Sequence, residues 1–248
     1  MNAMLDLESI ARRISESVPV VIDSSRFRRR AAVAAILRRN QSDTEVLFIK
    51  RAQRPGDIFS AQMAFPGGHW EQGDPDLCAT AIRETHEEIG LDLAQHGRLL
   101  GHLDFMDVTP VGRHEPMLIA PYLFALQADL PQLRFNHEVA AVHWGSLRSM
   151  VTGDAATSRD MWVRSRLSSY PGFAVDGEIV WGFTYQMLQG FLRLIGPPAN
   201  GLARGFCLKQ GIRSNSPPST KQGDACERPD QIPAGRIQNS QVLVQHPG

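Results

Sequence analysis

One short segment constrains this chain more than any other: FPGGHWEQGDPDLCATAIRETHEEIGL, residues 65–91. A glycine pair follows a strand-like run, and a helical pattern over residues 77–89 then carries Glu84, Glu87 and Glu88. On a helix these three side chains share one face, and like charges one turn apart repel each other. A helix that carries them must gain something that offsets this repulsion.

A bound divalent cation would convert that repulsion into attraction. Mg²⁺ prefers hard oxygen ligands and is usually held by a few carboxylates together with substrate phosphates. Arg83 precedes the first glutamate, and it can pair with Glu87 one turn on or with a carbonyl of the preceding loop. This arrangement would hold the helix against its loop.

The glycine loop before the helix has a matching chemistry. Gly67 and Gly68 permit backbone conformations and close approaches that other residues do not. The helix N-terminus that follows attracts anions weakly. We therefore expect the loop and the helix together to hold a diphosphate bridged by a metal ion. Each part alone has an ordinary interpretation, a turn and a solvated helix face, but the combination in this order is harder to obtain by chance.

The stretch from Gly68 to Leu91 resembles the Nudix box, G-x5-E-x7-R-E-U-x-E-E-x-G-U, in which U is a bulky aliphatic residue. The matching residues are Gly68, Arg83, Glu84, Glu87, Glu88, Gly90 and Leu91. Asp74 stands where the first glutamate belongs, with eight residues before Arg83 instead of seven, and Thr85 takes the first aliphatic position. An aspartate with one inserted residue is similar to the variant box of the coenzyme A pyrophosphatase branch. The role of Asp74 itself stays open.

The segment LFIKRAQRPGDIFSAQMAFPGG, residues 47–68, is similar to the upstream signature of that branch, L-L-T-x-R-[SA]-x3-R-x3-G-x3-F-P-G-G. It keeps Leu47, Arg51, Ala52 and the FPGG ending, but Asp57 and Ala61 stand where the second arginine and a glycine belong. WGFTYQML further on is similar to the ending of these proteins. The resemblance therefore spans residues 30–197 and is more specific for the family than for coenzyme A.

The resemblance implies a Nudix fold of α/β (α+β) class, in which a mixed β-sheet is sandwiched between α-helices. It implies that water attacks the diphosphate linkage of a nucleoside diphosphate joined to another moiety, with coenzyme A or a related nucleotide as a candidate. The implied cofactor is Mg²⁺ or Mn²⁺. The implied site residues are the metal ligands Glu84, Glu87 and Glu88, with Glu84 as an alternative general base, the orienting Arg83, and the substrate-binding Gly67, Gly68 and Arg51.

The general base in such proteins often comes from outside the box. Glu138, in FNHEVAAVHW, is our candidate because it lies just before a strand that can return to the cleft. An ordinary solvated glutamate at the start of a strand is an equally good interpretation. Glu115 and His114 are weaker candidates, and His86 is expected to be a surface residue of the helix.

Two other functions stay open. A Nudix fold without catalysis can act as a ligand-sensing or interaction domain. In such a domain the carboxylates of the box would be expected to be replaced by other residues, and here they are present. An RNA-end pyrophosphohydrolase would need a basic groove, for which the arginines between Arg26 and Arg30 are the one local hint. A solvated strand entry is the preferred interpretation of those arginines.

The composition is that of an ordinary globular protein, and the cysteine content fits a reducing compartment. The 248 residues are 42% apolar and formally uncharged at pH 7, so nucleic acid is an improbable partner. Three scattered cysteines form no disulfide framework, and no apolar run reaches the roughly 18 residues of a membrane span. The N-terminus lacks the pattern of a signal peptide. We expect a cytoplasmic protein whose oligomeric state is open, a homodimer being one option.

The chain is expected to divide into a helical extension (1–29), a Nudix domain (30–197) and a disordered tail (198–248). The tail has no sustained hydrophobic period and is rich in Pro, Gly, Ser and Gln. Strands are expected at 31–37, 44–52, 62–65, 98–110, 117–126 and 138–147, the third of them ending at Pro66 and the glycines. Helices are expected at 5–16, 77–89, 158–167 and 181–196, with a loop at 130–137.

Truncation after Gly196 should leave the fold and the activity largely intact, because the tail lacks the aromatic residues and the periodicity needed to pack. Thermal unfolding and turnover of the truncated and full-length chains check this. A large fall in the melting temperature would show that the tail contributes to the folded structure.

Overall fold

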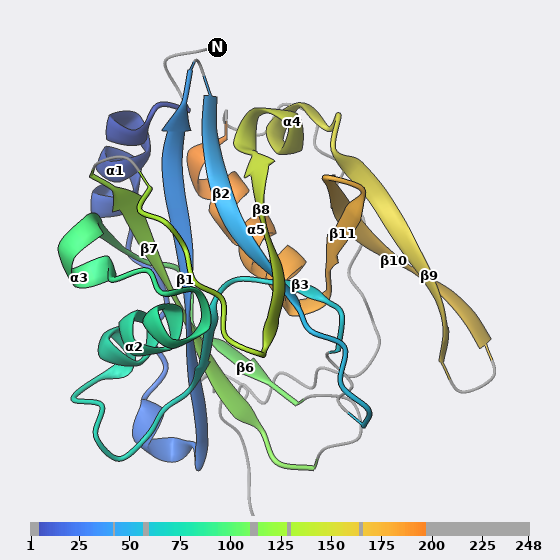
Figure 1. The fold of residues 1–248 in the computed structure, drawn as a ribbon, viewed down its shortest axis with the longest axis horizontal. Coiled ribbons are helices and arrows are strands. Elements are labelled where there is room, and N and C mark those ends of the chain that lie inside the picture. Colours follow the sequence, from blue (N-terminus) through green and yellow to red (C-terminus); the bar gives the residue numbers. More distant parts are fainter. Residues whose placement is uncertain are drawn as a thin grey trace, which may run out of the picture. The chain divides into compact units, whose positions relative to one another are not determined.

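The computed structural model describes residues 5–41, 43–56, 60–109, 114–127, 130–163 and 166–196 (Figure 1). The tail expected from residue 198 onward lies outside these ranges, and so does Asp57. The fold described below is therefore that of the segments between Leu5 and Gly196.

A mixed sheet forms the centre of the described fold. Its strands follow the order β3-β2-β1-β7-β5, with β4 also paired to β1, β6 to β7 and β8 to β2. β1 and β7 run parallel, and the other pairs are antiparallel. The bounds are β1 (Arg29–Asn40), β2 (Asp43–Arg51), β3 (Met63–Ala64), β4 (Gly67–His69), β5 (Gly97–His102), β6 (Met106–Val108), β7 (Met117–Leu126) and β8 (Val139–Ser146).

The central strand β1 explains why this sheet needs helices on both faces. Successive side chains of a strand point to opposite faces, and an apolar run without alternation is typical of a strand buried on both. In β1, Ala35 and Leu37 join one core, while Ala34 and Ile36 join the other. The sheet can be buried in this way only if each face has its own helical cover.

The helices divide between these two cores. α2 (Leu77–Ile89) and α3 (Leu93–His96) contribute to one core, and α1 (Leu7–Glu16), α4 (Leu147–Thr152) and α5 (Gly182–Ile195) contribute to the other (Figure 1). A short 3-10 helix, Ser24–Arg26, precedes β1. The predicted sheet between helices is confirmed, as are the helices expected at 5–16, 77–89 and 181–196. Over the described ranges, no helix combines the length and apolarity that crossing a membrane requires.

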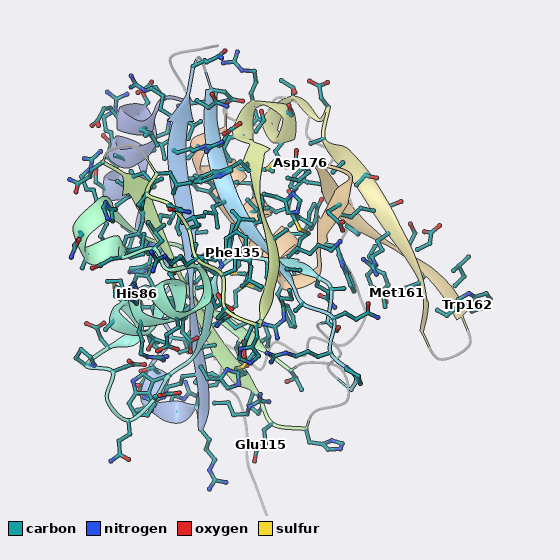
Figure 2. All side chains as sticks on the ribbon, in the orientation of Figure 1. His86, Glu115, Phe135, Met161, Trp162 and Asp176 are labelled. Atoms are coloured by element: carbon teal, nitrogen blue, oxygen red, sulfur yellow. The ribbon has the colours of Figure 1, made fainter. Side chains whose placement is uncertain are left out.

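The helix predicted over residues 158–167 is wrong. The segment belongs to a second sheet, with strand order β11-β10-β9, made of β9 (Ala156–Val163), β10 (Arg166–Val175) and β11 (Glu178–Trp181). β9 and β10 form an antiparallel hairpin whose ladder includes nearly every residue of the predicted helix. Aromatic residues such as Trp162, which is 71% exposed (Figure 2), favour strands, and cross-strand pairing overrides a weak helical spacing.

Two further sequence expectations need correction. The strand expected at 98–110 is divided into β5 and β6 by residues 103–105. The strand expected at 62–65 covers Met63–Ala64 in the structure, and the glycine pair that we placed in a loop lies in a separate strand, β4. Gly67 pairs with Val33 and Gly68 with Ala32, so the glycines are held by the central strand of the sheet.

The first helix is a packed part of this fold. Asp6 caps its N-terminus by accepting hydrogen bonds from the backbone N–H groups of Glu8 and Ser9. Its apolar side chains Ile10 and Ile14 are buried in the same core as α5. Nη1 of Arg13 donates to the carbonyl of Gly196 at the end of α5, so the first and last helices of the described fold are connected.

Replacing Ile10 by alanine should lower the free energy of unfolding by about 2–5 kcal/mol, because it removes a fully buried side chain and leaves a cavity. Arg12→Ala, on the exposed side of the same helix, is the matched control and should change it by less than about 0.5 kcal/mol. Urea unfolding of both variants checks this. Equal stability of the two would mean that the helix contributes little to the fold.

Candidate active site

The acidic helix α2 is fixed at both ends. Asp76 caps the N-terminus by accepting from the N–H of Ala79, and Gly90 ends the helix in the left-handed region, with φ of 71°. The N–H groups of Arg134 and Asn136 donate to the carbonyls of Ile89 and Glu88, each at 3.0 Å. The loop expected at 130–137 thus holds the last turn of α2. The Asp76 carboxylate already accepts from one of the free N–H groups at the N-terminus of α2.

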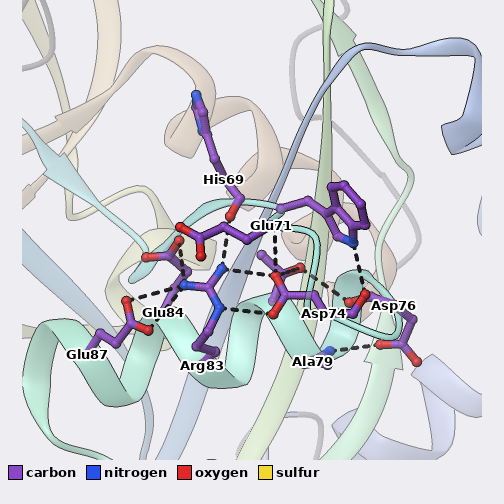
Figure 3. A network of polar contacts seen from close by, with 10 residues as sticks. His69, Glu71, Asp74, Asp76, Ala79, Arg83, Glu84 and Glu87 are labelled. Atoms are coloured by element: carbon purple, nitrogen blue, oxygen red, sulfur yellow. Dashed lines mark hydrogen bonds and ion pairs between the residues drawn. The ribbon is translucent and has the colours of Figure 1, made fainter.

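A single guanidinium organises the acidic side chains of this region (Figure 3). Nε and Nη2 of Arg83 donate to the two carboxylate oxygens of Asp74 at 2.9 and 3.0 Å. Nη1 lies 3.1 Å from Glu84 and donates to Glu87 at 3.2 Å, while Nη2 also donates to the carbonyl of His69 at 3.0 Å. The sequence left two partners open for Arg83, and the structure shows both.

Asp74 serves as the support of Arg83. Besides the guanidinium, its carboxylate accepts from the backbone N–H of Glu71 and from the hydroxyl of Thr80. The hydrogen bonds from Arg83 hold the pKa of Asp74 near 2, and the same bonds raise the pKa of Arg83. Both groups are therefore charged over the physiological pH range, and a bidentate pair of this kind fixes the guanidinium in one orientation.

Glu88 is the buried member of the acidic cluster. Its side chain is 2% exposed, and one oxygen accepts from the N–H of Gly67 at 2.9 Å. Burial raises the pKa of Glu88 to about 8, although the Gly67 hydrogen bond opposes this, and the charge of Glu84 adds to it. Burial also raises the pKa of Glu84, against the effect of Arg83. A cation beside these two carboxylates would favour their ionised forms.

The two glycines of β4 are required for different reasons. A Cβ atom on Gly68 would lie 2.5 Å from the carboxylate carbon of Glu84, so the absent side chain makes room for that group. Gly67 has φ of +148°, and its Cβ would lie 2.3 Å from the carbonyl oxygen of Ala32. The missing side chain of Gly68 therefore leaves space for the Glu84 carboxylate. The missing side chain of Gly67 lets the backbone of the central strand β1 approach closely.

Residues outside the box reach the same region because β2 and β8 pair. Arg51 is opposite Val139, and the N–H of Ala52 donates to the carbonyl of Glu138 at 2.7 Å. The charge of Arg51 lowers the pKa of Glu88, and that of Glu138 raises it. The structure thus brings both residues near the buried carboxylate.

Sequence reasoning missed Arg54 in this region. Its Nη1 donates to Glu138 at 3.0 Å, and its backbone N–H donates to the hydroxyl of Ser60. The one available signal was an arginine three residues after Arg51 in the upstream signature, displaced from the position where that pattern has its second arginine. The weaker candidates Glu115 and His114 are exposed, and Glu115 lies 4.0 Å from Arg28. His86 is exposed on α2, as expected (Figure 2).

The donor chemistry of the cluster fits a hard divalent cation. Glu84, Glu87 and Glu88 supply carboxylate oxygens from adjacent turns of one helix, the type of ligand that Mg²⁺ and Mn²⁺ prefer. In the described ranges, no three acidic, histidine or cysteine side chains are already grouped to hold a metal ion. Instead, Glu84 and Glu87 contact Arg83, and Glu88 contacts Gly67. Metal binding would thus require these side chains to exchange partners.

Comparison with known proteins identifies the family of this chain. The model of the NUDIX domain matches residues 28–164. An uncharacterised protein of Schizosaccharomyces pombe is 30% identical over 192 residues, which are 70% of this chain and 58% of that protein. The mitochondrial coenzyme A diphosphatase NUDT8 of Mus musculus is 29% identical over 180 residues, 70% of this chain and 83% of its own. This chain thus spans little more than half the length of the first of these relatives.

Solved structures were also found. A MutT/nudix family protein from Enterococcus faecalis is 16% identical, with a TM-score of 0.44, over 75% of this chain and 67% of its own. An Ap4A hydrolase from C. elegans is 23% identical, with a TM-score of 0.41, over 50% of this chain and 84% of its own. The domain match covers more than half of the residues, and the chain belongs to the Nudix family. The resemblance and the fold class expected from the sequence are confirmed.

The glycine pair yields a stability prediction. Gly67→Ala should lower the free energy of unfolding by roughly 2–6 kcal/mol, because a strained backbone and an overpacked contact each cost about 1–3 kcal/mol. Gly68→Ala should leave the stability nearly unchanged, since the flexible Glu84 side chain can turn away, but should weaken Mn²⁺ binding. Thermal unfolding and calorimetric titration with Mn²⁺ measure the two effects.

Gly73→Ala is the matched control for both variants. Its Cβ would meet nothing within 4 Å, so we expect wild-type stability and wild-type Mn²⁺ affinity. If Gly68→Ala binds Mn²⁺ as tightly as Gly73→Ala does, Glu84 does not contribute to metal binding.

Proposed function

We propose that this protein is a metal-dependent hydrolase that cleaves the diphosphate linkage of a nucleoside diphosphate joined to another moiety. The relatives support the expectation of a Nudix pyrophosphohydrolase, since one of them is a coenzyme A diphosphatase. Coenzyme A or a related nucleotide is the substrate that we propose first. The upstream segment differs from the coenzyme A signature at Ala61, so related nucleotides stay in the panel of candidates.

One observation carries this proposal: two carboxylates of α2, those of Glu84 and Glu88, lie against the glycines of β4, and Glu88 is buried although burial disfavours its charged form. A solvated helix face would leave Glu88 exposed, whereas here it is 2% exposed with a pKa of about 8. Strongly perturbed groups of this kind concentrate at functional sites. The ordinary interpretation of the acidic run, a solvated face, accounts for Glu87 alone.

Each residue then has a distinct role. Glu84, Glu87 and Glu88 would hold Mg²⁺ or Mn²⁺, which when bound supplies Lewis acidity toward the diphosphate and lowers the pKa of water. Arg83 keeps Glu84 and Glu87 in place and, through the His69 carbonyl, joins α2 to β4. Its role is positioning, because Asp74 occupies two of its donors.

Glu138 is the proposed general base. A carboxylate can accept the proton of the attacking water if it is ionised and within reach of the substrate. Arg54 contacts the carboxylate of Glu138 at 3.0 Å and orients it, and the pairing of β2 with β8 holds Glu138 near Glu88. Glu84 is the second candidate for this role. Arg51, at the end of β2, would contact the anionic substrate.

The alternatives predict different observations. A ligand-sensing domain would bind nucleotides without turnover. The unfavourable burial of the Glu88 carboxylate would then serve no catalytic role. An RNA-end pyrophosphohydrolase would prefer triphosphorylated or capped RNA over small nucleotides. Three further points stay predictions from the sequence: Mg²⁺ or Mn²⁺ as the metal ion, a cytoplasmic location, and a homodimer as one option for the oligomeric state.

A substrate panel tests the proposal. Coenzyme A, ADP-ribose, NADH, dinucleoside polyphosphates and capped RNA are incubated with Mg²⁺ or Mn²⁺, and the phosphorylated products are separated. We expect cleavage of at least one small nucleotide at its diphosphate, loss of activity in EDTA and recovery when metal is returned. Activity that persists in excess EDTA would rule out the mechanism.

Glu87→Gln and Glu88→Gln should each reduce turnover by orders of magnitude while the metal-free protein keeps or gains stability. Glutamine retains the shape of the side chain but removes one hard anionic ligand and the associated repulsion, worth roughly a few tenths of a kcal/mol per pair. At position 88 its amide oxygen can still accept from Gly67. Steady-state kinetics and thermal unfolding in EDTA separate the two effects.

His86→Gln is the control for these variants, because His86 is exposed on the same helix and has no assigned role. It should retain wild-type turnover. If the two glutamate variants match it, the acidic face is an ordinary solvated surface.

A further inference from the structure

Two basic side chains meet beside the acidic site without a role in it. Nη2 of Arg29 lies 3.2 Å from Nε2 of His69, in a contact exposed to solvent. A guanidinium can only donate, so Nε2 of His69 accepts and a neutral imidazole carries its proton on Nδ1. The imidazole thereby orients the guanidinium from one side.

The two side chains share one face of the sheet. His69 is opposite Ala31 in the β1–β4 ladder, and Arg29 lies two residues from Ala31 on the same strand. The backbone of His69 belongs to the acidic site, because its carbonyl accepts from Arg83, but its side chain points away from α2 (Figure 3). One residue of β4 therefore connects the acidic cluster with the basic pair.

A ligand can reach both. Gly68, against which the Glu84 carboxylate packs, is adjacent to His69, and neighbouring Cα atoms are about 3.8 Å apart. Within the described ranges β4 pairs with β1 as its one strand partner. A nucleotide whose diphosphate lies at Glu84 would reach the basic pair by extending past β4.

The charge of this surface suits a phosphate. Within the described ranges no carboxylate lies at ion-pair distance from Arg29. The adjacent Arg28 is 91% exposed, and its acidic neighbour Glu115 is 4.0 Å away and 60% exposed, a solvated pair that contributes little. Arginine binds phosphate through the planar set of N–H donors of its guanidinium. Arg29 is part of β1, the central strand of the sheet.

We propose that Arg29 and His69 form a subsite for a phosphate monoester that the substrate carries in addition to the diphosphate that is cleaved. The ligand class is a nucleotide phosphorylated on the ribose as well as at the 5′ position. The inference rests on the proposed function for the place of the diphosphate. It narrows the substrate from any nucleoside diphosphate derivative to one with a third phosphate.

Binding of two product-like nucleotides tests the subsite without metal or turnover. Adenosine 3′,5′-bisphosphate and adenosine 5′-monophosphate are titrated calorimetrically into the wild-type protein in EDTA. We expect the bisphosphate to bind more tightly by on the order of tenfold to a hundredfold, the size of one charge-assisted contact. In Arg29→Gln this ratio should fall to near one, and Arg29→Lys should restore part of it.

Arg39→Gln is the matched control. Arg39 is an exposed arginine on the same strand, ten residues and roughly 33 Å along it. It should keep the wild-type ratio. Equal ratios for the two nucleotides in the wild type, or equal losses in Arg29→Gln and Arg39→Gln, would overturn the subsite. His69→Gln supplies a second test if Arg29→Gln fails to fold, and should also reduce the ratio.

Turnover distinguishes failure of this inference from failure of the proposed function. The ratio of kcat/KM for coenzyme A to that for its 3′-dephospho form is measured in the wild type and in Arg29→Gln. We expect the wild type to favour coenzyme A and the variant to lose that preference. If the wild type hydrolyses coenzyme A and its 3′-dephospho form with equal kcat/KM, the subsite is rejected and the proposed function stands. If the wild type hydrolyses no diphosphate compound at all, the proposed function is rejected.

Discussion

The guanidinium of Arg83 is the interaction on which the rest of the site depends. It lies among Asp74, Glu84 and Glu87 and also reaches the carbonyl of His69. Without this positive charge, the carboxylates on one face of a single helix would repel each other and turn outward. Arg83 thus stabilises the acidic helix in the absence of metal, and it connects α2 to the strand that carries the glycines.

This support also explains how the site can be both stable and ready to bind a cation. Asp74 holds Arg83 through two hydrogen bonds and two further donors hold Asp74, so the guanidinium keeps its orientation when Glu84 or Glu87 leaves it. The carboxylates that contact Arg83 are partly exposed, whereas Glu88 is buried. A metal ion would therefore replace Arg83 as the partner of Glu84 and Glu87 and would neutralise the charge of Glu88.

Much of this could be predicted from the sequence, since the relevant signals are local. The acidic spacing, Gly90 and the arginine before Glu84 all act within one helix, and the helix limits at 77 and 89 agree with the structure. The role of Asp74 could not be predicted, because its partners Arg83 and Thr80 meet it only after the preceding loop folds back. The approach of Glu138 to Glu88 depends on the pairing of β2 with β8, which is a property of the whole sheet.

The errors have the same origin. Residues 158–167 carry apolar side chains at spacings compatible with either a helix or a strand, and only the partner strand β10 decides between them. The glycine pair illustrates the point with greater consequence. From the sequence, Gly67 and Gly68 are turn residues. In the structure they pair with β1, and a Cβ atom on Gly67 would clash with the carbonyl of Ala32, so glycine is needed there for the strands to pair.

That placement of the glycines is what makes the site rigid. A loop would let the N–H of Gly67 and the carbonyl of His69 move, and both are partners of the acidic helix. In β4 they are held by β1, a strand buried on both faces, so the positions of Glu88 and Arg83 are set by the core of the protein. The same ladder places Arg29 beside His69 on the other face. A substrate that contacts both faces of β4 would therefore meet two sets of charges whose separation is fixed by the sheet, and rigid spacing of this kind favours selection among nucleotides by the position of their phosphates.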